Sequence, residues 1–503
     1  MTFRNTKNTD AHGFAQLLRT EWTKFRKVRG WVIGIIVAAL LTAVPGLIIA
    51  TMISTQNANS GDSSPTLVGP GGEAVTDKFY FVHQTMTGDG SITVRVTSLT
   101  GLITYPPPNH DQIVPGVVRW AKAGIIIKDG IKQGTPYAAM MVTGSQGVRM
   151  QYNFINDIAG YPGSVSTESP RWLRLTRSGD AITGYESMDG IQWVEVGMAH
   201  LAGLPSSVQA GLFVTSPRNL EVSGYERSSR FTNATAVFDN LKLQGVTPSG
   251  AWSNDGIGIG RLPEISTGGV KESNGTFTVT GSGDIAALGD EGGWSIERSL
   301  FGVFFGLILV IVVAALFATA EYRRNVFRNT QFRGSQGGHV LAAKATVIGI
   351  FTFIAGLAAA AVAVPFGKQI LHSHGVYVPP APILSELRVI VGTAALLAVT
   401  AVLVLALATM LRRIIPAVVS GIALVVLPYV LANILTIDAA QWLLRLTPAA
   451  GFAIQQSTHQ YPQVISKYPL TPWAGFAVLC GYTALALGLS IFLLNRRKHK
   501  INE

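Results

Sequence analysis

A run of 22 uncharged residues at positions 299–320 constrains the fold of this chain more than any other feature. A helix rises about 1.5 Å per residue, so about 20 apolar residues cross the roughly 30 Å hydrocarbon core of a bilayer. A helix inside a soluble domain keeps a polar stripe toward water, and this run has none. We therefore expect residues 299–320 to span a membrane.

Five similar runs bring the expected number of spans to six. None of the six contains Lys, Arg, Asp, Glu or His. A charged residue at the bilayer centre costs at least about 2.5–3.5 kcal/mol, and ion-coupled carriers retain such residues because their mechanism needs them. Their absence from the six runs argues against ion coupling, so the energy for any transport would come from outside the membrane. The first run is too long for a signal peptide, and we interpret it as a retained anchor. The spans are expected at 31–53, 299–320, 345–367, 389–411, 414–437 and 473–494.

The placement of basic residues predicts the orientation of the spans, because Lys and Arg are enriched on the cytoplasmic side. Residues 54–298 hold 17 Lys/Arg and 22 Asp/Glu, a net charge of −5, whereas the rest of the chain holds 22 and 6, a net charge of +16. We therefore expect a bacterial cell-membrane protein with both termini and residues 321–344 in the cytoplasm and residues 54–298 outside. Basic residues at span ends indicate contact with membrane lipid rather than with nucleic acid.

Two amphipathic segments are expected beside the spans. Within residues 1–30, one helical face gathers Phe14, Leu17, Leu18, Trp22 and Phe25. This pattern is typical of a helix at the inner membrane surface, although an ordinary solvated amphipathic helix shares it. Residues 438–471 contain a similar stretch, broken by Pro448, and are expected to form an outer interfacial loop. Residues 495–503 complete the chain as a cytoplasmic tail.

Short alternating stretches separated by turn signals fill residues 54–298. About ten such stretches predict an antiparallel β-sandwich. Residues 172–196 predict a three-strand meander, because Gly179-Asp180 and Asp189-Gly190 are turn signals. The single cysteine, Cys480, lies in the last span, so the sandwich has no disulfide. The predicted fold class is a bundle of six transmembrane helices with a β-sandwich inserted between the first two.

The inserted region resembles the concanavalin-like jelly-roll module of secreted proteins that act on sugars. The similar residues are Thr87 to Gly90, Arg95-Val96, Trp120 to Gly124, Trp172 to Arg177 and Phe238 to Leu241. The usual opening of that family is a Trp, an Asp turn and a strand of the GTFTVTGSG type. Here it comes last, at Trp252, Asp255-Gly256 and residues 274–285. The resemblance implies a circular permutation, in which residues 275–279 lie inside the sandwich.

Two kinds of site are candidates in the sandwich. Its tryptophans could form an outer face that binds a sugar or a peptide, although tryptophans are more often core residues. A pair of carboxylates could hydrolyse glycosides, but the spacing singles out no pair, and exposed turn carboxylates are common. The tryptophans are Trp120, Trp172 and Trp193, and the carboxylates are Glu186, Asp189 and Glu195.

No catalytic, cofactor-binding or metal-binding residue is predicted in this chain. His372 and His374 could share a metal, but the sequence offers no further ligand close by. A G-x-x-x-x-G-K-[ST] loop, which would bind ATP, does not occur.

The membrane part resembles the permease subunit of ABC-2 type exporters. The similar stretches are LLRTEWTKFRKVRGW before the first span, ATAEYRRNVFRNT after the second, HVLAAK before the third and WLLRLTPAAGFAI before the sixth. The resemblance implies a dimer of permease protomers, identical or not, with two copies of a separate ATP-binding subunit that holds ATP and Mg²⁺.

The family's ATPase-docking surface is implied here by position. It would include Glu21 and Trp22 of the N-terminal helix, and the segment with Glu321, Tyr322, Arg323, Arg324 and Phe327 after the second span. The sandwich replaces a short loop of the family and leaves the cargo open, with amphiphilic peptides or lipids expected rather than ions. The alternative is a membrane-anchored protein that binds or senses a carbohydrate or peptide without transport.

Overall fold

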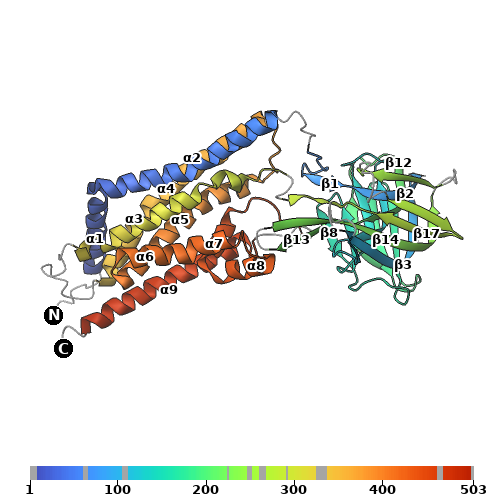
Figure 1. The fold of residues 1–503 in the computed structure, drawn as a ribbon. Coiled ribbons are helices and arrows are strands. Elements are labelled where there is room, and N and C mark those ends of the chain that lie inside the picture. The colour runs from blue at the N-terminus through green and yellow to red at the C-terminus, as the bar shows by residue number, and fades with distance from the viewer. Residues whose placement is uncertain are drawn as a thin grey trace. The chain divides into compact units, whose positions relative to one another are not determined.

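The computed structural model describes residues 8–59, 66–104, 112–223, 226–245, 252–259, 268–289, 293–323, 337–461 and 468–499. The chain divides into two compact units, and we describe each by itself. The helical unit comprises Met1–Ser63, Trp294–Thr458 and Ser466–Glu503, and the β unit comprises Ser64–Gly293 and His459–Ile465. Figure 1 shows the helices of the first unit and the strands of the second.

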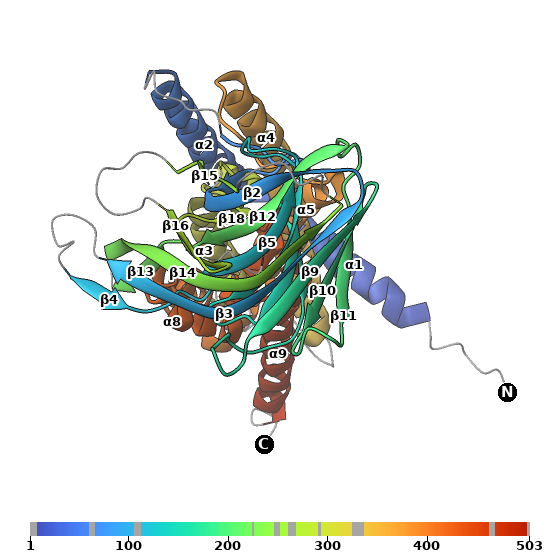
Figure 2. The same cartoon turned by 90° about the vertical axis from the view of Figure 1, so that its right-hand side faces the viewer.

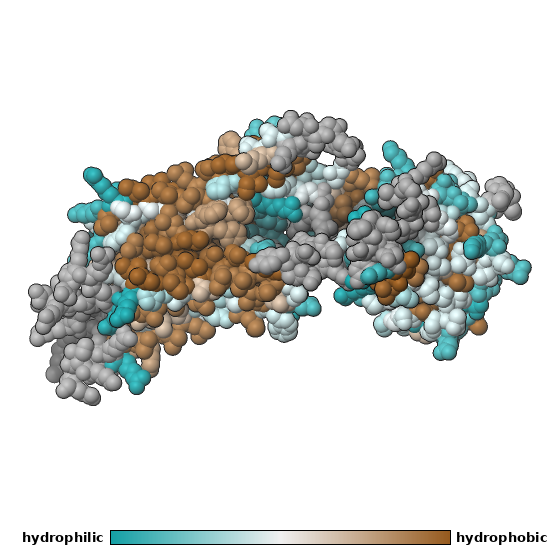
Figure 3. Space-filling model, in the orientation of Figure 1, coloured by the Kyte–Doolittle hydropathy of each residue, from teal (hydrophilic) through white to brown (hydrophobic). Residues whose placement is uncertain are grey.

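Within the described residues, six helices of the helical unit are long and apolar enough to cross a membrane. Figure 3 shows hydrophobic residues covering much of the visible face of this unit. The chain is therefore a multi-pass membrane protein, as predicted. The elements are α1 (Asn8–Lys27), α2 (Arg29–Asn59), the 3-10 helix η2 (Ile296–Leu300), α3 (Val303–Arg323), α4 (Gly337–Ser373), α5 (Ile383–Leu411), α6 (Ile414–Gly421), the π-helix η4 (Ile422–Val426), α7 (Leu427–Leu431), α8 (Ile437–Leu446), the 3-10 helix η5 (Pro448–Gln455) and α9 (Pro472–His499).

The fifth spanning helix is interrupted where the sequence predicts a continuous span over 414–437. It passes from α6 through the π-helical turn η4 into α7, and ends at Leu431. Pro428 explains the interruption, because it has no N–H to donate to the carbonyl of Leu424 four residues earlier. A wider π turn just before the proline rearranges the local hydrogen bonds.

Helices α2 and α3 meet at glycines. A Cβ added to Gly306 would lie 2.0 Å from the Thr42 hydroxyl oxygen, and one added to Gly302 would lie 2.3 Å from the Leu41 carbonyl oxygen. A Cβ at Gly46 of α2 would lie 1.7 Å from the Ser299 carbonyl oxygen. Gly302 and Gly306 are four residues apart and so lie on one face of α3, the small-residue spacing that lets membrane helices approach to backbone contact.

We predict that Gly306→Leu destabilises the helical unit by about 1–3 kcal/mol, because the new side chain must push α2 away from α3. The measurement is thermal unfolding of the purified full chain in detergent. Gly481→Leu is the matched control, since nothing lies within 4 Å of a Cβ at that position of α9. Equal effects of the two substitutions would contradict the α2–α3 contact.

The β unit consists of two large antiparallel sheets and a separate strand pair. We call the large sheets the β5 sheet, ordered β15-β2-β12-β5-β6-β7-β8, and the β3 sheet, ordered β11-β10-β9-β3-β14-β17-β16 with β13 on β14 and β4 on β3. Figure 2 shows β9, β10 and β11 following β3 across one layer. The strands are β1 (Val75–Asp77), β2 (Phe79–Thr87), β3 (Gly90–Thr104), β4 (Ile113–Pro115), β5 (Lys122–Lys128), β6 (Tyr137–Thr143), β7 (Val148–Tyr152), β8 (Asn156–Ala159), β9 (Arg171–Ser178), β10 (Ala181–Ser187), β11 (Val194–His200), β12 (Ser207–Thr215), β13 (Asn219–Ser223), β14 (Glu226–Gln244), β15 (Ser253–Ile257), β16 (Gly269–Ser273), β17 (Thr276–Gly281) and β18 (Ile285–Ala287).

An apolar core lies between the two large sheets. Successive strand residues point to opposite faces, so alternate positions such as Ile92 and Val94 of β3 and Ile125 and Ile127 of β5 enter this core and are 0% exposed. The predicted fold class, a membrane helix bundle with an antiparallel β-sandwich between its first two spanning helices, is thereby confirmed. The predicted meander is also present as β9-β10-β11.

The last strands of the β unit belong to the sandwich. β17 pairs with β14, and β15 pairs with β2. Residues 275–279 thus meet the condition that the permutation hypothesis sets, because β17 begins at Thr276. The circular permutation itself stays a prediction.

Candidate functional site

An aromatic cluster fixes α1 against the helical unit. Phe25 is fully buried, and its ring centroid lies 4.5 Å from that of Phe351 on α4 and 5.2 Å from that of Phe317 on α3. Trp22 lies 4.6 Å from Phe351, and Trp31 lies 5.1 Å from Phe317. The apolar face predicted for this helix therefore packs on α3 and α4. Its position at a membrane surface stays a prediction.

The two residues of α1 that the family resemblance implies for docking point into the helical unit. Glu21 is 3% exposed, and one of its carboxylate oxygens accepts a hydrogen bond from Lys24 Nζ at 2.7 Å. Trp22 is half-buried against Phe351. Their role in ATPase docking stays a prediction, but burial suits them to position α1 rather than to touch a partner. The exposed side chains of this helix include Arg19, Thr23, Arg26 and Lys27.

The second part of the implied docking surface starts at the end of α3. Glu321, Tyr322 and Arg323 are its last three residues, whose side chains lie outside the described part of the structure, as do Arg324 and Phe327 altogether. Phe317 precedes Glu321 by about one helical turn, or roughly 5–6 Å. Since Phe317 contacts Phe25, the described residues bring α1 and the beginning of this segment together.

At α4, a lysine reaches the same aromatic cluster. Lys344 is 6% exposed, and its Nζ lies 5.6 Å from the Phe317 ring centroid. The sequence places Lys344 in a cytoplasmic segment before the third span, but α4 already begins at Gly337. The third spanning helix therefore continues back to Gly337 as one helix, which includes the last part of the expected cytoplasmic segment.

Polar contacts join η5 and the residues after it to α5 and η2. Gln455 Nε2 donates to the Thr393 hydroxyl at 3.0 Å, and Arg388 Nη2 donates to the Gln456 carbonyl at 2.5 Å. The Ser457 hydroxyl contacts the Glu297 carboxylate. Every residue of η5 is buried, whereas α8 exposes Trp442 and Leu446. The sequence places both elements in an outer interfacial loop, and that placement stays a prediction. Within the helical unit, η5 packs against α5, where Gly392 leaves room for Ile454.

Arginines cover two of the candidate tryptophans in the β unit. Arg174 lies 3.8 Å from the Trp193 ring centroid, and Arg95 lies 5.7 Å from that of Trp172. Trp193 Nε1 donates to the Gly190 carbonyl, and the backbone of Gly190 lies close against the Trp172 ring. Trp172 and Trp193 therefore share one neighbourhood on the β3 sheet and are half-buried. A sugar- or peptide-binding role for them stays a prediction.

Trp120 lies apart from this pair. It precedes β5, and Arg149 of the β5 sheet lies 5.5 Å from its ring centroid. Trp120 therefore stacks with a side chain of the opposite sheet from Trp172 and Trp193.

The three candidate carboxylates face different directions. Glu186 is 2% exposed, accepts a hydrogen bond from the Tyr161 N–H, and has its pKa raised by burial. Glu195 pairs with Tyr185, the neighbour of Glu186, so it projects from the other face of the sheet. Asp189 accepts hydrogen bonds from two backbone N–H groups of its own turn, which lower its pKa.

The histidine pair has a local explanation. His374 Nδ1 lies 2.9 Å from the Ile370 carbonyl oxygen, and both His372 and His374 are exposed at the end of α4. Within the described ranges, no group of three or more His, Cys, Asp or Glu side chains is arranged to hold a metal ion.

The sequence analysis missed a buried polar cluster on the β5 sheet. Lys122 and Lys128 are 0% exposed, and they are the first and last residues of the strand KAGIIIK. Lys128 pairs with Asp77, and Lys122 pairs with Asp284. Burial lowers the pKa of Lys128 and raises that of Tyr137 well above its usual range. Two lysines bounding a wholly apolar strand are the one sequence signal that could have indicated these ion pairs.

Comparisons with known proteins give weak likenesses. No family model matches the chain, and the comparison with curated proteins gives no match. Among solved structures, a functionally unknown protein from Saccharomyces cerevisiae is 16% identical with a TM-score of 0.19, covering 34% of this chain and 76% of its own. Scytalido-glutamic peptidase with a transition state analog inhibitor is 8% identical with a TM-score of 0.27, covering 41% of this chain and 98% of its own. We draw no functional conclusion from likenesses of this size.

The ion pair beside Trp172 predicts a pH dependence. Arg95 donates from Nε and Nη2 to the two carboxylate oxygens of Asp239, at 2.7 and 2.5 Å, and this pairing holds the pKa of Asp239 below its ordinary value of 3.8. A depressed folded pKa means stabilisation that is present above the unfolded value and is lost as the pH falls through the folded value. The pair is partly exposed, so we expect Asp239→Asn to lower stability at neutral pH by about 1 kcal/mol.

That deficit should shrink as the pH is lowered from about 5 to about 2, because only the parent chain loses the ion pair there. The measurement is the unfolding of the full chain by denaturant at each pH. Glu272→Gln, at an exposed carboxyl of β16, is the control and should leave the parent's pH profile unchanged. A deficit of Asp239→Asn that is constant over this range would refute the assignment.

Proposed function

We propose that this chain is the membrane-spanning subunit of an ATP-driven exporter of the ABC-2 type. Two such subunits would form the path for the cargo, and two copies of a separate ATPase would bind ATP and Mg²⁺ and drive the movement. The observation that carries the proposal is the packing of α1 through Phe25 onto Phe317 and Phe351. Through this contact, a movement of α1 would displace α3 and α4 together.

The charges of α1 support a docking role. Its buried side places Glu21, Trp22 and Phe25 against the other helices, and its open side exposes Arg19, Arg26 and other polar residues. A partner that binds the open side would move a rigid element whose aromatic residues are already engaged. Closely packed interfaces transmit such movement as small rigid shifts because they are poorly deformable.

The basic segment that starts at Glu321 would complete the docking surface. It continues α3, which is itself in backbone contact with α2 through Gly302 and Gly306. A displacement of this segment would therefore move α3, and with it α2, the helix that precedes the β unit. Glu321, Tyr322, Arg323, Arg324 and Phe327 remain the proposed contacts.

The cargo class follows from the apolar character of the helices. The second spanning helix exposes Phe305 and Ile308, and the fifth exposes Ile415 and Val419. Such surfaces suit amphiphilic peptides or lipids better than ions, because an ion needs polar groups to replace its water. The β unit would receive or gate the cargo outside the cell.

We predict that three variants each lower the amount of a P-loop ATPase that co-purifies with the full chain by at least about tenfold. They are the double variant Arg26→Glu with Lys27→Glu, the single variant Glu321→Arg and the single variant Arg324→Glu. Each reverses charge on the docking surface. The measurement is mass spectrometry of the chain purified from its native membranes. Lys271→Glu, an exposed charge reversal on β16, is the control and should retain the ATPase.

Two other outcomes have definite meanings. If all the variants keep the ATPase, the docking surface is wrongly assigned. If no ATPase accompanies even the parent chain, and the reconstituted chain moves no solute with ATP present, the membrane-anchored binding or sensing protein becomes the better account.

A further inference from the structure

One face of the β5 sheet is covered by the two ends of the β unit. We call it the covered face, meaning the face turned away from the β3 sheet. Val75 of β1 and Ile285 of β18 pack there against a small apolar cluster that includes Phe81, Phe213 and Ala139. β1 and β18 pair only with each other, as a separate antiparallel sheet. We call this strand pair the strap.

The composition of the covered face differs from that of an ordinary core. It carries Lys122 and Lys128 of β5, Tyr137 of β6, Gln151 of β7 and Asp157 of β8, with side chains 0–3% exposed. The opposite face of the same strands is lined mainly by apolar residues such as Ile125, Ile127, Ala138, Met140 and Met150. An antiparallel sheet with one apolar and one polar face normally turns the polar face to water.

Several polar groups on the covered face lack good partners. Tyr137 Oη and both amide atoms of Gln151 make no hydrogen bond of normal geometry, and neither does Asp77 Oδ1 of the strap, although all are buried. The carboxylate of Asp157 forms a long ion pair with Arg149, at 3.4 Å, and burial raises its pKa. Buried polar atoms without partners destabilise the closed arrangement, since water would satisfy them if the cover moved away.

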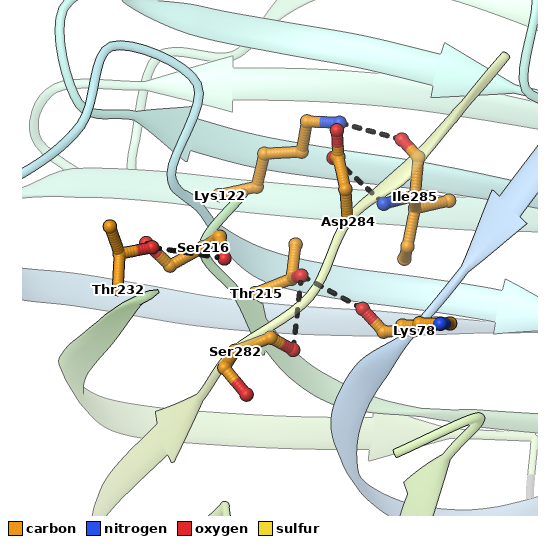
Figure 4. A network of polar contacts seen from close by, with 8 residues as sticks. All are labelled: Lys78, Lys122, Thr215, Ser216, Thr232, Ser282, Asp284 and Ile285. Carbon is orange, nitrogen blue, oxygen red and sulfur yellow. Dashed lines mark hydrogen bonds and ion pairs between the residues drawn. The ribbon is translucent and has the colours of Figure 1, made fainter. Parts of the chain in front are cut away.

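Ion pairs and hydrogen bonds hold the strap on this face. Lys128 Nζ lies 2.8 Å from Asp77 Oδ2, and Lys122 Nζ donates to Asp284 Oδ1 at 2.7 Å and to the Ile285 carbonyl at 2.6 Å. Figure 4 shows the second contact set, in which the Thr215 hydroxyl also donates to the Lys78 carbonyl at the end of β1. Buried ion pairs add little net stability, because the charges lose their hydration when the strap closes.

The position of the strap in the chain allows it to separate from the covered face without disrupting the two large sheets. β1 is the first named strand of the β unit and β18 is the last. Neither is hydrogen-bonded into the ladder of either large sheet, so displacing the pair breaks no other strand pairing. Strands hydrogen-bonded into one of the large sheets could not move away without breaking the pairing of that sheet.

We propose that the β1–β18 strap is a releasable lid, and that the β unit has a second state in which the polar covered face is open to water. In that state the sandwich core between the two large sheets stays intact. The ion pairs Lys128–Asp77 and Lys122–Asp284 hold the strap closed, and we call them the latches. This inference concerns the β unit alone and does not depend on the transport proposal.

The test compares two buried alanines that are neighbours on β6. Ala139 lies on the covered face and Ala138 in the sandwich core, and both are 0% exposed. Each is replaced by cysteine in full-length chain carrying Cys480→Ala, and the rate of modification by N-ethylmaleimide is measured under native conditions. We expect the cysteine at 139 to react at least about tenfold faster than the cysteine at 138, because lid opening exposes only the former.

Breaking a latch sharpens the comparison. Lys128→Met leaves Asp77 without its cation and should speed modification at 139 by at least about tenfold while leaving position 138 unchanged. Adding Asp77→Leu, which removes the unpaired charge, should bring the rate at 139 back toward that of the parent. Equal rates at the two positions, equal acceleration by Lys128→Met, or no reaction at 139 would each overturn the proposal.

Discussion

The insertion of a large domain between two adjacent helices is the constraint on which the rest of this structure depends. α2 is in close contact with η2 at Gly46 and with the start of α3 at Gly302 and Gly306, so the chain must leave α2 and return beside it. The β unit meets the same requirement independently, because its first and last strands pair with each other. In each unit, the two places where the chain leaves and returns around the insertion therefore lie side by side.

The two units differ in where many of their polar side chains find hydrogen-bond partners. In the helical unit, hydroxyls such as those of Thr42, Thr352 and Thr393 donate to the carbonyl four residues earlier, so they need no partner from another helix. In the β unit, long-range pairs such as Arg95–Asp239 and Lys128–Asp77 join strands distant in sequence. Local bonding suits a lipid environment, and long-range bonding defines the register of a sandwich.

The periodicity of the sequence predicted those parts of the structure that one strong local signal determines. Uncharged runs predicted the spanning helices, and turn residues such as Gly179 and Gly190, both at positive φ, predicted the meander. Features that depend on distant partners were missed. η5 is buried because Gly392 of another helix makes room for it, and no pattern within residues 448–455 reveals this. The latches likewise join Lys122 and Lys128 to acids 162 and 51 residues away.

The π-helical turn at Ile422–Val426 bears on how the sequence can vary. A π turn holds one residue more than the α-helical turn it replaces, so it marks a place where the helix carries a single extra residue. Deleting one residue there would replace the π turn by an ordinary α-helical turn while keeping α6 and α7 on their present faces, with Pro428 still in place. The same deletion elsewhere in that helix would rotate everything beyond it by about 100°, since an α-helix turns once in 3.6 residues. Relatives of this chain can therefore differ by one residue in length at this turn without any change in how their fifth spanning helix packs.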